Sequence, residues 1–166
     1  FAVEHRAEDL LAFATSAIRE ATNGNDVLEH VQSTSGVTLT ELSGDQEAAI
    51  TFSAVRRWFG WSAGRILDFD IGGGSFEMAI GTNALPSVAT SVPLGAGRLY
   101  RAYLAGSDVA SPAQFKALRK HVRTTLRPAV DRIAGGGHPN FVAGTSKTFR
   151  SLARICGAAP SAQGPY

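Results

Sequence analysis

The segment Ile66–Gly81 reads ILDFDIGGGSFEMAIG, and its pattern guides the interpretation of the whole chain. An apolar run ending at Asp70 is followed by three glycines, a serine and a second alternating run. Two strands joined by such a turn present backbone N–H groups in a concave arrangement that suits phosphate oxygens. Asp70 and Glu77 flank the turn and are placed to bind a divalent cation. The sequence therefore predicts a phosphate and metal site, with donors from Gly72, Gly73, Gly74 and Ser75.

Size and composition indicate a globular chain. Its 166 residues correspond to one ordinary domain or two small lobes. An apolar fraction of 44% and a charged fraction of 18% argue against disorder. No apolar run approaches the roughly 20 residues of a membrane-spanning helix, and no signal peptide is evident, so we expect a cytoplasmic protein without a membrane partner. The single cysteine, Cys156, excludes an internal disulfide and is expected to be a buried thiol.

The charges are distributed unevenly along the chain. Residues 1–80 contain five Lys or Arg against twelve Asp or Glu, whereas residues 81–166 contain eleven against two. Thirteen of the sixteen basic residues are arginines, whose planar fork matches phosphate oxygens. A basic half facing an acidic, metal-binding half would suit a polyphosphate substrate, and two separately solvated faces are the alternative.

The order of apolar patterns predicts an α/β protein with a mixed sheet. Strands are expected at 10–17, 37–42, 65–71, 76–81, 88–93 and 141–143, with helices between and after them, and residues 1–10 read as the end of a helix. Ser43 and Gln46 form a predicted capping box for a helix that runs to Phe59. Pro128 is expected to bend or break the helix predicted over 112–133. Trp58 and Trp61 are expected to pack at a break between lobes.

Five segments, taken in order, resemble motifs of one enzyme family. They are ATSAIREATN (14–23), SGDQEA (43–48), DIGGGSFE (70–77), SVPLGAGRL (91–99) and VAGTSKTFRSLA (142–153). They resemble the ATSAxRxAxN, SGxEEA, GGGSTE, SxPLGxxRL and GTSGT segments of the exopolyphosphatase / guanosine pentaphosphate phosphohydrolase family, which is part of the acetate kinase, heat-shock chaperone and actin superfamily. The chain departs from the family pattern at Gln46, Phe76 and Lys147.

This resemblance implies an actin-like ATPase (ribonuclease H-like) fold with a mixed sheet, as part of a two-lobe arrangement. Residues 1–57 would be the C-terminal part of the first lobe, and residues 58–166 an incomplete second lobe. The other phosphate loop of the family, roughly D-x-G-S-N-S, is not found in this sequence. We therefore expect the chain to be the central piece of a longer enzyme and to hydrolyse little or nothing by itself.

The resemblance also implies roles for individual residues. Glu47 would be the catalytic base that activates water, the alternative being a first-turn glutamate that favours the helix dipole. Arg19 would bind phosphate, with a surface salt bridge as its alternative. Asp70 and Glu77 would bind Mg²⁺.

The substrate is less narrowly defined by the sequence. Lys147 replaces a glycine near the expected nucleotide-base end of the cleft, which favours inorganic polyphosphate over guanosine pentaphosphate. Arg98 could contact phosphate or belong to a segment that only turns the sheet. A basic stripe at Lys116, Arg119, Lys120, Arg123 and Arg127 is either a solvated face or a guide for a polyanion; nucleic acid fits less well, because no aromatic residues are interleaved with the charges. A non-catalytic phosphate-sensing module is a further alternative, and a homodimer of the full-length protein is left open.

Overall fold

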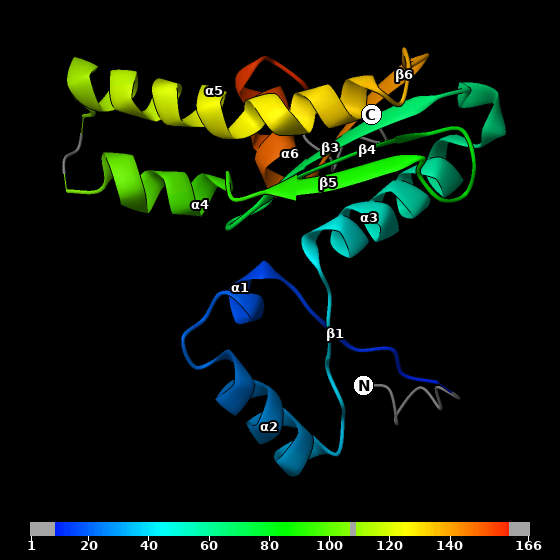
Figure 1. The fold of residues 1–166 in the computed structure, drawn as a ribbon, viewed down its shortest axis with the longest axis vertical. Coiled ribbons are helices and arrows are strands. Elements are labelled where there is room, and N and C mark those ends of the chain that lie inside the picture. Colours follow the sequence, from blue (N-terminus) through cyan, green and yellow to red (C-terminus); the bar gives the residue numbers. More distant parts are fainter. Residues whose placement is uncertain (1–8, 107–108, 160–166) are drawn as a thin grey trace. The chain divides into compact units, whose positions relative to one another are not determined.

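The computed structural model describes residues 9–106 and 109–159, and it contains both helices and strands, as predicted for an α/β protein (Figure 1). Contacts within the chain define two units, one up to Ser43 and one from Gly44 onward, which are described separately below. The predicted lobe boundary after residue 57 falls inside the first helix of the second unit, and the assignment of residues to lobes stays a prediction. None of the helices in the described ranges is long and apolar enough to cross a membrane.

The first unit contains two short parallel strands and two helices. These are β1 (Phe13–Ala14), α1 (Ser16–Arg19), α2 (Gly24–Ser35) and β2 (Thr40–Glu41). Both strands are shorter than predicted, because the two segments run together for only two residue pairs. Helix α2 ends at Gly36, whose φ of 72° lies in the left-handed region that glycine adopts without strain. The helix expected to end near residue 10 lies largely outside the described residues.

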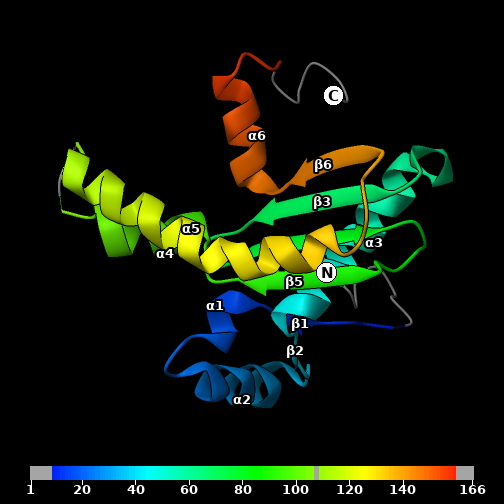
Figure 2. The same cartoon turned by 45° about the horizontal axis from the view of Figure 1, so that its top comes forward.

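The second unit is a four-stranded mixed sheet with helices on both faces (Figures 1 and 2). Its strands are β3 (Ile66–Ile71), β4 (Phe76–Gly81), β5 (Val88–Val92) and β6 (Phe141–Thr145), in the order β5-β4-β3-β6. Its helical segments are α3 (Gly44–Phe59), η1 (Trp61–Ala63), α4 (Ala96–Leu99), η2 (Tyr100–Leu104), α5 (Pro112–Ala134) and α6 (Ser146–Ile155). Strands β3 and β6 are parallel, whereas β4 is antiparallel to both β3 and β5.

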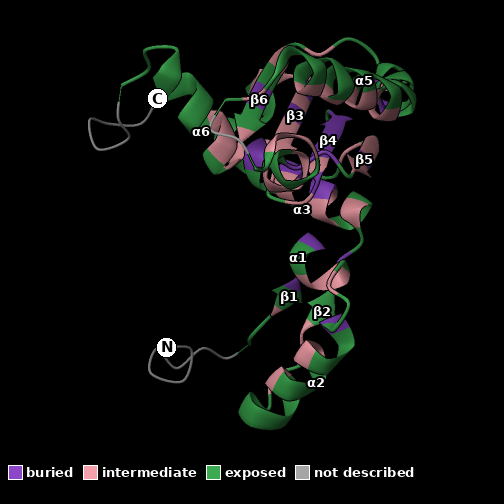
Figure 3. Ribbon diagram, turned by 90° about the vertical axis from the view of Figure 1, so that its left-hand side faces the viewer, coloured by how far each residue is buried: buried purple, intermediate pink, exposed green. Residues whose placement is uncertain are grey.

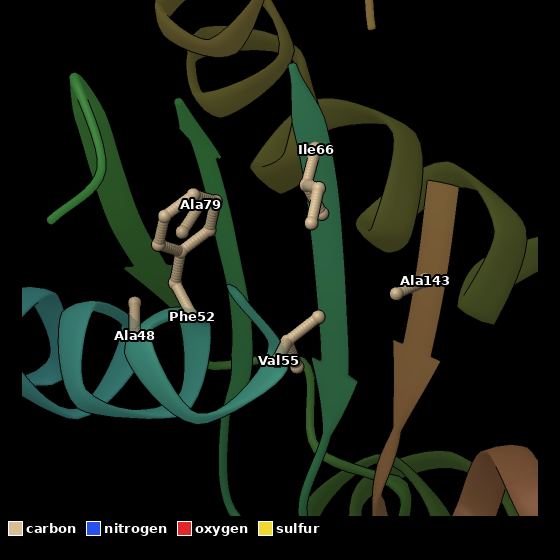
Figure 4. Close-up of a cluster of buried hydrophobic side chains, with 6 residues drawn as sticks. All are labelled: Ala48, Phe52, Val55, Ile66, Ala79 and Ala143. Atoms are coloured by element: carbon tan, nitrogen blue, oxygen red, sulfur yellow. The ribbon is translucent and has the colours of Figure 1, made fainter. Parts of the chain in front are cut away.

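Alternation along the strands divides the core into two layers. Helix α3 packs Ala48, Phe52 and Val55 against Ile66, Ala79 and Ala143 on one face (Figure 4). Helix α5 packs Ala129 and Ile133 against Met78 and Ile80 on the other face. Strand β4 lies between these layers and is almost entirely buried (Figure 3). Its glutamate, Glu77, is therefore held within a rigid, well-packed element.

The helix break that was one expectation for Pro128 does not occur, and two expectations about burial were wrong. Helix α5 continues through Pro128 without a break, because Ala129 and Ile133, which follow the proline, anchor its last turns on the sheet. Trp58, near the end of α3, is 73% exposed, since the buried face of that helix belongs to other residues, and Trp61, in η1, is 65% exposed. Cys156 is exposed because it lies just beyond α6, a helix without a single buried residue.

Candidate functional site

The glycine turn between β3 and β4 is held from behind by the segment that follows β5. The carbonyl of Gly72 accepts a hydrogen bond of 2.9 Å from the N–H of Ala96. The carbonyl of Gly73 accepts one of 2.9 Å from the N–H of Arg98. The carbonyl of Gly74 accepts from the N–H of Gly95 at 3.2 Å and from Nε of Arg98 at 2.8 Å. All three glycine carbonyls are thus occupied.

The N–H groups of the same turn are the candidate phosphate donors. In the described ranges, the N–H groups of Gly73 and Gly74 donate to no backbone carbonyl, whereas that of Gly72 closes the turn onto the carbonyl of Ser75 at 3.0 Å. A turn whose carbonyls are occupied and whose N–H groups are not offers donors without competing acceptors, which is the electrostatic requirement for an anion. This arrangement fits the predicted phosphate cradle.

Gly95 lies in contact with the glycine turn. A Cβ at Gly95 would come within 2.4 Å of the backbone N and C of Gly74, a distance that real Cβ atoms do not show. At Gly97 the closest atom, the carbonyl oxygen of Gly73, would be 3.1 Å away. The segment was predicted either to contact phosphate through Arg98 or only to turn the sheet. In the structure it braces the glycine turn, and Arg98 contributes to the brace through Gly74.

Four polar residues form a row across the sheet, one on each strand. The strand register pairs Glu77 with Ser91 on β5 and with Asp70 on β3, and it pairs Asp70 with Thr145 on β6. Residues paired across a sheet point to the same face, so this polar row places Asp70 and Glu77 next to each other. In the chain, Asp70 comes shortly before the glycine turn and Glu77 shortly after it. The sequence predicted two carboxylates beside the turn, and the structure brings them together.

The environment of Glu77 is unusual for a carboxylate. The side chain is only 4% exposed, and its Oε1 accepts a 2.8 Å hydrogen bond from Oγ of Ser91. Burial raises the pKa of Glu77, and the negative charges of Glu47 and Asp70 raise it further, whereas hydrogen bonds from Ser75 and Ser91 lower it. Glu47, in the first turn of α3, is therefore close enough to act on Glu77 electrostatically. Like charges gathered this way favour a bound cation or a proton.

The carboxylates fit a magnesium-type ion. Mg²⁺ usually retains waters and binds through one or two carboxylates together with substrate phosphates. Asp70 and Glu77 provide such a pair beside the phosphate cradle. In the part of the chain that the structure describes, no three His, Cys, Asp or Glu side chains form a complete metal-binding group. A cation here would thus need further ligands from phosphate and water, which is the usual situation for magnesium.

The first turn of α3 is fixed to strand β5. The N–H of Ser91 donates to Oδ1 of Asp45 at 3.2 Å. A Cβ on Gly44 would meet the Cβ of Ser91 at 2.4 Å, so glycine is needed for this close approach. On the other carboxylate oxygen, Asp45 forms a 3.5 Å ion pair with Arg132 of α5. Glu47 follows Asp45 in the same turn, so its position depends on these contacts.

The other predicted site residues lie apart from this cluster or in the other unit. Lys147 is the second residue of α6, directly beyond the end of the polar row at Thr145. Ser146, between them, has a φ of 76°, a strained value for a residue other than glycine. Arg19 belongs to the first unit, where its Nη1 donates to the carbonyl of Leu42. Contact of Arg19 with the phosphate site stays a prediction.

Sequence reasoning missed Asp68. This residue is 3% exposed, and its Oδ1 has no hydrogen-bond partner among the described residues. Burial, and secondarily the charge of Asp70, raise the pKa of Asp68 to about 7. The available signal was its position, since residues two apart on a strand share a face and Asp68 is two residues before Asp70. Ser91, Asp45 and Arg132 were missed as well, because their contacts depend on tertiary structure.

Comparison with known protein sequences identifies one family. The model of the Ppx/GppA phosphatase family matches residues 1–164. Exopolyphosphatase 1 of Mycobacterium leprae is 51% identical over 164 residues, covering 99% of this chain and 48% of that protein. Exopolyphosphatase 1 of Mycobacterium tuberculosis is 48% identical, covering 99% and 47%. The chain therefore spans about half the length of these relatives.

Solved structures give the same fold. An exopolyphosphatase from Cytophaga hutchinsonii superposes with a TM-score of 0.79 at 21% identity, over 98% of this chain and 53% of that one. A Ppx/GppA family member from Aquifex aeolicus superposes with a TM-score of 0.71 at 24% identity, over 93% and 48%. These similarities confirm the predicted fold class, an actin-like α/β fold with a mixed sheet.

Proposed function

This chain belongs to the Ppx/GppA phosphatase family, and from that membership we propose that it is the central part of an exopolyphosphatase. The full-length enzyme would release the terminal phosphate from inorganic polyphosphate with the help of a divalent cation, Mg²⁺ in our proposal. The observation that carries the proposal is the braced glycine turn beside the paired carboxylates Asp70 and Glu77, because hydrolysis of a phosphoanhydride requires both features at one place.

Three tasks of the reaction can be assigned to residues of this chain. The N–H groups of Gly73 and Gly74 would bind oxygens of the terminal phosphate and stabilise the charge that develops there. Asp70 and Glu77 would hold the cation, whose bound form neutralises phosphate charge. Glu47 would accept the proton of the attacking water, since a carboxylate held within hydrogen-bond reach of water is a competent base. The remaining phosphate contacts would come from Arg19 and from parts of the enzyme beyond this chain.

The substrate preference rests on positive charge. Lys147 would add a cation at the far end of the polar row, where a nucleotide base would need space. Residues 81–166 also carry eleven basic residues against two acidic ones. Both features favour an extended polyphosphate over guanosine pentaphosphate. Phosphate release from the two substrates by the full-length protein tests this preference, and equal or faster turnover of the nucleotide would contradict it.

A non-catalytic sensing role is the second candidate, favoured by the N–H groups of Gly73 and Gly74, which could bind phosphate without a catalytic base. The catalytic role and the sensing role can be distinguished at Glu47, because binding of the substrate requires no general base. In the full-length protein, Glu47→Gln is expected to retain substrate binding and to lose at least about 100-fold in turnover. Gln46→Glu, one residue earlier in the same turn, is the control and is expected to remain active. A wild-type protein that binds polyphosphate but releases no phosphate would support sensing.

A further inference from the structure

Ser91 lies at the junction between the two acidic parts of the candidate site. Its hydroxyl donates to Oε1 of Glu77 at 2.8 Å, and its backbone N–H donates to Oδ1 of Asp45 at 3.2 Å. One residue of β5 therefore contacts both a metal-ligand candidate on β4 and the helix turn that carries Glu47. A displacement of Ser91 would therefore disturb both Glu77 and the first turn of α3.

The contact between Ser91 and Glu77 fixes the orientation of a carboxylate. Glu77 is almost fully buried, and the hydrogen bond from Ser91 to its Oε1 restricts the rotamers that the carboxylate can adopt. Partners of this kind behind metal ligands determine affinity, because a ligand that must be reoriented binds more weakly. The hydroxyl of Ser91 also favours the charged form of Glu77, which is the form a cation requires.

The contact between Ser91 and Asp45 fixes the helix. The first turn of α3 is held against β5 by two contacts. Oδ1 of Asp45 accepts the hydrogen bond from the N–H of Ser91, and Gly44 approaches the side chain of Ser91 closely. Arg132 extends the arrangement: its Nη1 donates to Oγ1 of Thr90 at 3.1 Å and its Nη2 to the carbonyl of Ala89 at 3.2 Å. The ion pair of Arg132 with Asp45 is more than half exposed and contributes little by comparison.

The geometry points to Ser91 as a positioning residue. It holds the metal-ligand candidate Glu77 and the first turn of α3, which carries the candidate base Glu47, in a fixed arrangement. This inference rests on the proposed function for the role of Glu47 as a base and for the role of Glu77 as a metal ligand, and the role of Glu77 can be tested without turnover. The two contacts of Ser91 can be tested separately. Loss of the hydroxyl should weaken metal binding, and loss of the contact with Asp45 should lower turnover.

Metal binding is measured on the full-length protein with Mn²⁺ alone, by the electron paramagnetic resonance signal of free Mn²⁺. Ser91→Ala is expected to weaken Mn²⁺ binding about 10- to 100-fold, and Ser91→Thr, which keeps the hydroxyl, to restore it. Ser87→Ala is the matched control, because the hydroxyl of Ser87 donates a 2.9 Å hydrogen bond to the carbonyl of Ile80, away from the carboxylates. Unchanged affinity in Ser91→Ala, or equal losses in Ser91→Ala and Ser91→Thr, would overturn the inference.

Turnover is measured with Asp45→Ala, which leaves the Ser91 hydroxyl in place. We expect kcat to fall while the Mn²⁺ affinity stays close to that of the wild type. Asp45→Asn keeps an oxygen for the N–H of Ser91 and is expected to retain most of kcat. A fall in Mn²⁺ affinity in Asp45→Ala equal to that in Ser91→Ala would show a general structural effect and contradict the division of roles. Because Mn²⁺ binding needs no turnover, an inactive wild-type protein would refute the proposed function and still leave the Ser91 experiment decisive.

Discussion

Buried carboxyl groups distinguish this site at the scale of single residues. Asp68 has an oxygen without a partner, and Glu77 is shielded from solvent beside two other acids. Burying a charge costs free energy unless the charge is paired or neutralised, so these carboxyl groups destabilise the folded protein when they are charged. A bound cation would relieve that cost at Glu77. A proton would relieve it at Asp68, whose pKa burial raises to about 7.

The pKa of Asp68 predicts a pH-dependent stability. Its folded-state pKa of about 7 exceeds the ordinary value of 3.8, so the folded state binds the proton more tightly than the unfolded state. Stability is therefore lost as the pH rises from about 4 through 7, by as much as about 4 kcal/mol. Asp68→Asn is expected to raise the free energy of unfolding of the full-length protein at pH 8 and to change it little at pH 4, as measured by urea unfolding.

The control for this experiment is Asp131→Asn, which removes an exposed acid from α5. It is expected to change stability slightly and equally at both pH values. An effect of Asp68→Asn that is the same at pH 4 and pH 8 would contradict the assignment of a raised pKa.

The close contact of Gly95 with the glycine turn leads to a second prediction about a single residue. An alanine at residue 95 would place its Cβ 2.4 Å from the backbone of Gly74, so the phosphate loop would have to move. Misplacing a catalytic group by about 1 Å can cost roughly 100-fold in rate, and we expect a loss of this size in Gly95→Ala. Gly97→Ala is the control, since its 3.1 Å contact needs only a small shift. Steady-state kinetics of the full-length variants decides, and equal activities would show that the brace is unimportant.

At the scale of elements, α5 combines two functions. Its C-terminal half packs on the sheet, whereas its N-terminal half extends past the sheet at the end where β3 leads into the glycine turn (Figures 1 and 2). The exposed face of that half borders a groove with a volume of about 880 Å³, lined in part by Lys116, Arg119, Lys120 and Arg123. No acidic residue occurs between residues 112 and 130. Like charges at these spacings repel one another, and a polyanion would relieve the repulsion.

We predict that this stripe contributes to binding of long substrates. The triple variant Lys116→Gln/Arg119→Gln/Arg123→Gln is expected to raise KM for long-chain polyphosphate roughly tenfold and to weaken its salt dependence, because fewer counterions are released on binding. Turnover of the shortest substrate is expected to be unchanged. Arg57→Gln, which removes an exposed arginine of α3, is the control. A KM that does not depend on the triple change would identify the stripe as a solvated face.

At the scale of elements, the sequence was sufficient to predict some features of the fold but not others. The glycine turn, the strands around it and helix α5 were located correctly, since each depends on local periodicity and turn residues. The polar row needed the register of four strands, of which only the β3–β4 hairpin is local. Exposure of Trp58 and Trp61 could not be predicted either, because periodicity identifies an apolar residue but not the surface that covers it.

At the scale of the whole molecule, the chain spans about half the length of the curated relatives that it matches. The proposed phosphate loop, cation ligands and base lie within its second unit, and Arg19 lies within its first. We therefore expect the isolated chain to release little or no phosphate from polyphosphate, whereas the full-length protein is active. Metal-dependent phosphate release by the isolated chain, at a rate comparable to the full-length protein, would show that the remaining half is not required for catalysis.

The brace behind the glycine turn has a consequence for amide hydrogen exchange. The N–H groups of Gly95, Ala96 and Arg98 donate to the turn and should be protected from exchange with solvent whether or not a ligand is present. The N–H groups of Gly73 and Gly74 donate to no described backbone carbonyl and should exchange quickly until phosphate binds. Added phosphate and metal should therefore slow exchange at the N–H groups of Gly73 and Gly74 and leave exchange at Gly95, Ala96 and Arg98 unchanged. A turn braced in this way should be ordered before a ligand arrives, so binding should cost it little conformational entropy.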